Sequence, residues 1–324
     1  MPVLKKFVSY TLPFVLGGLL LYWVLEDLPL HELRAGLGNL AERLNLSWLV
    51  LAVAAYGGLA LLHGVRFRWV LRQQAALSLP QAFSIYAIAS LLNIFIPARA
   101  GDLYKSVHTT KLTHAPFAET LALATADLIL WGFGFVVWMA VVAVIGWDLL
   151  ATLPRLRLAI VLEAVGGLLG LGLFAALAPH FQRWVIPQSK WGGRLWLFVH
   201  GLYATLTPRV ALRAEFLAVA GWLCEILIAL SVVNGLGLHI SFVQAALLMA
   251  AVTTAMIIPS PGGVGPFEAA GTYVLTLYGA PKAEAALLAI AYHLMFIAVP
   301  LVVGAACYLA QQLRERARPA MVSP

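Results

Sequence analysis

Long apolar stretches alternate along this chain with short polar segments. A helix of about 20 apolar residues crosses the roughly 30 Å hydrocarbon core of a bilayer. Six stretches suit such a crossing: 7–25, 46–65, 119–146, 157–178, 214–236 and 283–310. They predict an all-α polytopic membrane protein with about six full transmembrane helices.

Two further apolar stretches are short and end at proline. Residues 82–97 stop at Pro97 and residues 242–258 stop at Pro259. The segment 99–118 that follows Pro97 is too rich in charge to cross lipid. The first stretch therefore either crosses once or enters the membrane and returns. Residues 267–280 are apolar, so 242–280 forms either a re-entrant hairpin or two short spans.

The distribution of Lys and Arg discriminates between these arrangements. With a re-entrant first stretch, five lie outside, and the remaining 16 of the 21 lie in the cytoplasm. With a single crossing, the count is eight inside and 13 outside. Positive charge prefers the cytoplasmic side. We therefore expect a re-entrant hairpin and a protein of the cytoplasmic membrane with both termini in the cytoplasm.

The second half of the chain resembles the first. When the chain is shifted so that Pro97 falls on Pro259, Gly101 falls on Gly263, and most apolar stretches fall on one another. The two halves, about 7–146 and 157–310, begin on opposite sides of the membrane. An inverted-topology repeat with one broken helix in each half has this pattern. The alternative is a chance register between two helices that end in proline.

Composition excludes other classes of protein. Hydrophobic residues make up 62% of the chain and charged residues 11%, whereas soluble domains average about 45–50% and about 25%. We expect one transmembrane domain over 1–324, without a soluble catalytic domain. The net charge of +7 is explained by topology and anionic lipid, without nucleic acid. No pattern indicates a catalytic residue, a metal site or a cofactor.

The two breaks carry the candidate binding residues. The first contains Pro97, Arg99, Gly101 and Asp102, and the second contains Pro261, Gly262, Gly263, Gly265 and Glu268. A broken helix in a membrane leaves backbone groups unpaired, which is tolerated where the break faces protein or a wet cavity. The breaks therefore predict a polar cavity, unless they are two ordinary surface loops between short spans.

This pair of motifs resembles the transmembrane region of the lysylphosphatidylglycerol synthase family, also called the flippase-like domain family. The resemblance covers nearly the whole chain and implies lipid translocation through a cavity between two re-entrant elements. The first motif departs mildly, with Ala98 where glycine is commoner and Asp102 where glutamate is. The lipid-aminoacylating member carries a large soluble domain, whereas 14 residues follow position 310 here. We therefore expect no such chemistry and no enzyme activity.

Several other ionisable residues are candidates. Lys105 begins a basic stripe after the first break, which either holds lipid phosphates or anchors the topology. Asp127, Glu225 and His293 lie inside apolar stretches and either form an intramembrane relay or make structural contacts. Arg66, Arg68 and Arg72 after the second span likewise either hold lipid phosphates or anchor the topology at the cytoplasmic interface, where His63 snorkels.

Together these patterns predict a flippase-like transporter of a phospholipid or lipid-linked molecule, with anionic or headgroup-modified membrane lipids as partners. Arg99, Asp102 and Glu268 are expected to line one cavity, with Lys105 at its cytoplasmic edge. A proton-coupled transporter of a small solute that uses Glu225 and His293 is one alternative. An integral-membrane enzyme on lipid-linked substrates is the other.

Overall fold

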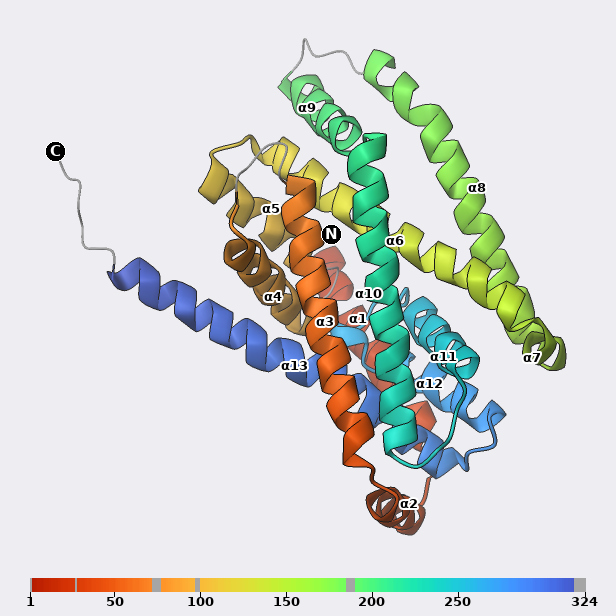
Figure 1. Cartoon of the computed structure of the whole chain (residues 1–324). Coiled ribbons are helices and arrows are strands. Elements are labelled where there is room, and N and C mark those ends of the chain that lie inside the picture. The colour runs from red at the N-terminus through yellow and green to blue at the C-terminus, as the bar shows by residue number, and fades with distance from the viewer. Residues whose placement is uncertain (1, 27, 72–76, 97–99, 185–189, 318–324) are drawn as a thin grey trace.

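The computed structural model describes residues 2–26, 28–71, 77–96, 100–184 and 190–317. Over these residues the fold is all-α, with no strand (Figure 1). The helices are α1 (Pro2–Leu25), α2 (Leu30–Glu42), α3 (Leu46–Leu71), α4 (Leu79–Phe95), α5 (Ala100–Thr113), α6 (Phe117–Ile145), α7 (Trp147–Thr152), α8 (Pro154–Trp184), α9 (Lys190–Thr205), α10 (Pro208–Gly235), α11 (Phe242–Ala255), η1 (Pro261–Gly263), α12 (Pro266–Leu277) and α13 (Lys282–Ala317).

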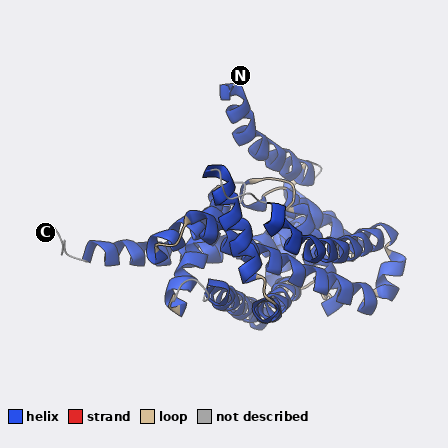
Figure 2. Ribbon diagram, turned by 90° about the horizontal axis from the view of Figure 1, so that it is seen from above, coloured by secondary structure: helices blue, strands red, loops and turns tan. Residues whose placement is uncertain are grey.

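Within the described residues, four helices are long and apolar enough to cross a membrane. They are α3, α6, α10 and α13, which coincide with four of the six expected spans. The other two expected spans fall on α1 and α8, and their crossing stays a prediction. The chain is thus a helical membrane protein. Figure 2 shows one end of α1 and the C-terminal part of α13 reaching beyond the rest of the bundle.

An antiparallel pair of helices, α3 and α10, forms the centre of the bundle (Figure 1). The amide of Asn45, just before α3, donates to the carbonyl of Gly235 at the end of α10, at 2.8 Å. Small residues such as Ala52 and Ala229 are fully buried in the surrounding core. Because small side chains let helix backbones approach closely, this pair has the extensive contact on which the other helices pack.

The two short helices α4 and α11 begin in the same way. Ser78 and Gln81 form a capping box at α4, where the amide of Ser78 donates to Gln81 Oε1 at 2.9 Å. Ser241 and Gln244 repeat it at α11, at 2.8 Å. Each box satisfies two backbone amides that a helix start leaves free. Both helices therefore have fixed starting points.

Each short helix is followed by a break and a second short helix that packs against it. In the first pair, the amide of Gly101 at the start of α5 donates to Asn93 Oδ1 at 2.8 Å. A Cβ atom on Gly101 would lie 2.0 Å from the carbonyl oxygen of Ala89. Only glycine allows α5 to lie this close to α4.

The second break uses glycine for its backbone conformation. Gly262, Gly263 and Gly265 all have positive φ, at 59°, 81° and 95°. This region is open to glycine and costly for other residues. At Gly265 the chain also passes close to α1, since an added Cβ would lie 2.1 Å from the carbonyl oxygen of Gly17.

Candidate functional site

The end of the first short helix, α4, contacts the second break. The C-terminal end of α4 packs against η1, and a Cβ atom on Gly262 would lie 3.2 Å from the carbonyl oxygen of Ile94. Segments from the two halves of the chain, far apart in the sequence, are thus in contact. Pro97 and Arg99 lie outside the described residues.

A buried cluster of charged side chains lies beside the first pair of short helices. Asp127 on α6 joins two cations: its Oδ1 is 3.1 Å from Arg66 Nη2 and its Oδ2 is 3.6 Å from Lys105 Nζ. The side chains of Arg66 and Asp127 are 2% and 3% exposed. Lys105 also pairs with Asp102 at 2.9 Å. Two cations and two carboxylates therefore balance one another, with Arg66, Lys105 and Asp127 buried and Asp102 partly exposed.

Aromatic rings enclose this cluster. The Arg66 guanidinium lies over the Trp131 ring at 4.8 Å, and Arg66 Nη2 is 3.2 Å from His63 Nδ1. The His63 ring stacks on Tyr86, with centroids 4.4 Å apart. Arg66 Nε has no hydrogen-bond partner among the described residues. A buried donor without a partner is costly, so this nitrogen is available to an acceptor that enters the cluster.

A second buried pair of side chains, Glu268 and His293, connects the second break to α13. His293 Nδ1 on α13 is 2.6 Å from Glu268 Oε1, and His293 Nε2 is 2.9 Å from the carbonyl oxygen of Gly262. The amide of Gly265 donates to the other carboxylate oxygen of Glu268 at 2.7 Å. Phe267 stacks on the imidazole at 4.2 Å. Glu268 is thus both a helix cap and the partner of a histidine.

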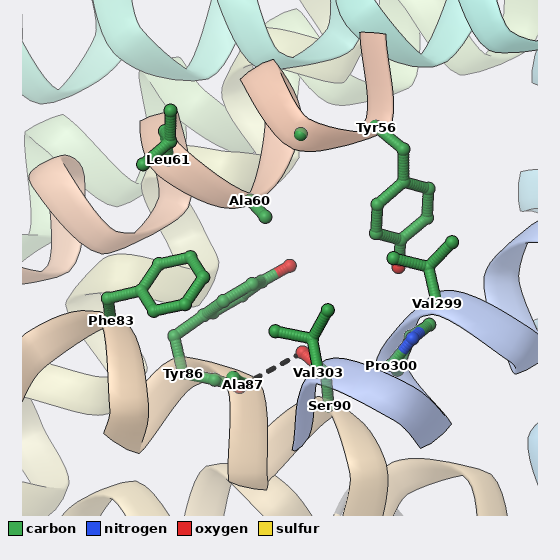
Figure 3. A pocket seen from close by; sticks show the side chains of 11 residues that line it. Tyr56, Ala60, Leu61, Phe83, Tyr86, Ala87, Ser90, Val299, Pro300 and Val303 are labelled. Carbon is green, nitrogen blue, oxygen red and sulfur yellow. Dashed lines mark hydrogen bonds between the residues drawn. The ribbon is translucent and has the colours of Figure 1, made fainter. Parts of the chain in front are cut away.

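An apolar pocket of about 240 Å³ lies between α3, α4 and α13 (Figure 3). The hydroxyl groups of Tyr56 and Tyr86 point into it. The other walls are mainly hydrocarbon, and Leu61, at the α3 side, is 56% exposed to the surroundings of the bundle. The Tyr86 side chain therefore has two roles: its ring contacts His63 of the charged cluster, and its hydroxyl enters the pocket.

The family of the chain follows from comparison with known proteins. A model of the lysylphosphatidylglycerol synthase TM region matches residues 10–304. The chain belongs to this family. No curated protein matched the chain. The resemblance found in the two Pro–Gly breaks is therefore confirmed, and it extends over nearly all helices of this family member.

The structure of this lysylphosphatidylglycerol synthase TM-region protein brings the predicted site residues into two groups. Asp102, Lys105 and Asp127 lie together in the charged cluster. Glu268 and His293 form a separate pair beside Gly262 and Gly265. A single cavity shared by Asp102 and Glu268 stays a prediction.

The third predicted intramembrane residue, Glu225 on α10, belongs to neither group. It lies within electrostatic range of Tyr56 and Tyr86, the two residues whose hydroxyls enter the pocket. It is also within range of Tyr292, the neighbour of His293. Glu225 thus acts electrostatically on both the pocket and the neighbour of His293.

Two residues of the cluster are buried in protein, which the sequence does not indicate. Arg66 and His63 are expected to reach water at the cytoplasmic interface, but they are 2% and 8% exposed and bonded to each other. The reason is that Asp127 and the Trp131 ring replace water around the guanidinium. Their depth in the membrane stays a prediction. The spacing of three residues, which sets His63 and Arg66 on one helix face, is the available signal.

Proposed function

We propose that this protein moves a membrane lipid between leaflets, as a transporter without enzyme activity. The lipid is a phospholipid or lipid-linked molecule with an anionic or modified headgroup. Membership of the lysylphosphatidylglycerol synthase TM-region family supports a lipid-related role in a membrane. The contact between the end of α4 and the second break supports a translocation site where the two halves of the chain meet.

The observation that carries the proposal is that the apolar pocket and the charged cluster follow one another along α3. The pocket residues Tyr56 and Leu61 lie near the midpoint of this helix, and Arg66 lies toward its C-terminal end. Arg66 is about seven residues, or about 11 Å, from the midpoint. A lipid headgroup lies at about half of the roughly 30 Å core thickness from the bilayer centre. In this proposal the hydrocarbon pocket lies at the depth of a lipid's acyl chains, and the charged cluster lies near the depth of its headgroup.

In this arrangement an acyl or isoprenoid chain occupies the pocket, and the anionic headgroup approaches the charged cluster past Tyr86. Arg66 Nε supplies an unused donor, and a guanidinium suits phosphate oxygens. Because Asp127 and Asp102 already neutralise Arg66 and Lys105, a phosphate would compete with a carboxylate. Such competition keeps binding reversible, as transport requires.

The helix bounds support an inverted-topology repeat with two re-entrant hairpins. The shift that carries Pro97 onto Pro259 carries α3 onto 208–233, against Pro208–Gly235 for α10. The same shift carries α4 onto 241–257, against Phe242–Ala255 for α11. The antiparallel packing of α3 on α10 is the relation that an inverted repeat produces. In this proposal both termini are cytoplasmic, and the hairpins enter from opposite sides.

A reconstitution experiment tests the proposed function. The full chain is placed in proteoliposomes with a trace of headgroup-labelled lipid, from a panel of anionic, zwitterionic and lysine-modified lipids. The loss of label to a membrane-impermeant quencher is then followed. We expect faster leaflet exchange than in protein-free vesicles for at least one lipid with an anionic or modified headgroup. Exchange no faster than in empty vesicles across the panel would reject the proposal.

A proton-coupled transporter of a small solute is the second candidate. The buried Glu268–His293 pair favours it, because paired ionisable groups inside membranes often carry protons. The hydrocarbon walls of the pocket disfavour a hydrophilic solute. A soluble anion that competes with labelled lipid, and is itself taken up into the vesicles, would support this candidate.

A further inference from the structure

The imidazole of His293 faces two hydrogen-bond acceptors. Nδ1 is 2.6 Å from a carboxylate oxygen of Glu268, and Nε2 is 2.9 Å from the carbonyl oxygen of Gly262. His293 is 2% exposed and Glu268 5% exposed. A neutral imidazole has one N–H and therefore cannot donate to both.

The geometry therefore requires one extra proton on the pair. Either His293 is an imidazolium beside an ionised Glu268, or Glu268 is a neutral acid that donates to Nδ1. The amide of Gly265 donates to the second carboxylate oxygen at 2.7 Å, and hydrogen bonds from N–H groups favour the ionised carboxylate. In both forms, Glu268 and His293 share the same extra proton.

The charged residues on the helices that pack against α13 do not compete with Glu268 and His293 for this proton. Helix α13 packs against α2, α4, α10 and α12. Helix α4 carries no charged residue, and α12 contributes Glu268. Arg43, just after α2, contacts α13 through Glu284, more than two turns before His293. From α10, Glu225 is within electrostatic range of Tyr292. Among the described residues, the ion pair of His293 is with Glu268.

We infer that Glu268, His293 and the Gly262 carbonyl form a proton-binding site that controls the second break. When the proton leaves to water, one N–H remains for two acceptors. The carboxylate is the stronger acceptor, so the N–H stays with Glu268. Nε2 then turns a lone pair toward the Gly262 carbonyl oxygen. That bond between α13 and η1 is lost.

Loss of this bond reaches the first pair of short helices as well. Gly262 lies against Ile94 at the end of α4, so freeing Gly262 from His293 loosens the contact between α4 and the second break. Release and uptake of one proton thereby alternate a loose and a tight contact between the two halves of the chain. This inference rests on the proposed function only for its link to lipid movement, which a proton gradient would then drive.

The test follows the position of the break without using transport. Val264→Cys is introduced into the full chain with Cys224 and Cys307 replaced by Ala, and the purified protein is reconstituted in vesicles. Labelling by a maleimide is measured across pH and corrected for the intrinsic pH dependence of a free thiol. We expect it to be about tenfold faster at high pH, the effect of losing one hydrogen bond to a charged group.

Variants identify the source of this response. His293→Gln and Glu268→Gln should abolish the pH dependence, whereas His239→Gln, at an exposed histidine, should keep it. A pH-independent parent, or an unchanged response in both site variants, would overturn the inference. Lipid movement is followed in the same vesicles with and without a proton gradient. Movement without a pH response in labelling rejects the proton site alone. A pH response without any lipid movement rejects the proposed function alone.

Discussion

Arg66 on α3 binds Asp127 on α6 twice. Its Nη2 is 3.1 Å from the Asp127 carboxylate, and its Nη1 donates to the Asp127 backbone carbonyl at 3.1 Å. A buried charge that loses its partner destabilises a protein more strongly than an exposed one. The charged cluster therefore holds α3, α5 and α6 together as well as offering a place for a headgroup.

The first prediction concerns Asp127. Asp127→Asn leaves the buried Arg66 without its carboxylate and should cost about 3–5 kcal/mol of stability. Asp102→Asn is the matched control, because the Asp102 side chain is 22% exposed and its ion pair among the described residues is with Lys105; its cost should stay within about 1 kcal/mol. Thermal unfolding of both variants in detergent measures the difference. Equal unfolding temperatures would show that Asp127 contributes no special stability.

The second prediction concerns the first break. Gly101→Ala places a methyl group 2.0 Å from the carbonyl oxygen of Ala89, so α5 must move away from α4. We expect a loss of at least about 1–3 kcal/mol, as for other overpacked sites. Gly132→Ala in α6 is the control, since nothing lies within 4 Å of its added atom. A Gly101 variant as stable as the Gly132 variant would argue against the close packing of this hairpin.

The main features of the fold could be predicted because hydropathy and breakers determine them. Four predicted spans coincide with α3, α6, α10 and α13. Pro259 and the glycines that follow it mark the second break. The motif Ser-x-x-Gln at Ser78 and Ser241 is a further signal in the sequence, because it marks the start of a helix.

The charged cluster could be predicted only in part. Asp127 stands out because a carboxylate inside an apolar stretch is unusual. Arg66 does not, because an arginine at the end of a span is normally expected at the interface. Its burial depends on Asp127 and Trp131, which both lie on a helix distant in the sequence, α6. Hydropathy carries no information on which distant helix supplies a partner.

The third prediction concerns topology. Single cysteines are introduced at Lys111, in the last turn of α5, and at Gly38, in α2, which are both exposed, in a background where Cys224 and Cys307 are replaced by Ala. With a re-entrant first hairpin, position 111 should react only after the cytoplasmic side is opened, and position 38 in intact cells. The reason is the excess of Lys and Arg on the cytoplasmic side. Labelling of position 111 in intact cells would contradict the re-entrant arrangement and the cytoplasmic termini.

The last prediction concerns the pocket between α3, α4 and α13. Ala60 lies in its wall, and Ala60→Trp should fill much of the space. If a lipid chain occupies the pocket during transport, lipid movement should fall about tenfold or more, which corresponds to about 1.4 kcal/mol of lost chain binding. Burying two CH₂ groups contributes about 1.6 kcal/mol, so even partial filling should have a measurable effect.

The control for this prediction is a tryptophan of the same size on an open surface. Val144→Trp on α6 changes a side chain that is 77% exposed, and it should leave both stability and lipid movement near those of the parent. The unfolding temperature of Ala60→Trp must also stay near the parent value, so that a loss of transport reflects the pocket. If Ala60→Trp is stable and moves every lipid of the panel at the parent rate, the chain does not pass through this pocket. The translocation path would then have to be sought elsewhere, for instance where the end of α4 contacts η1.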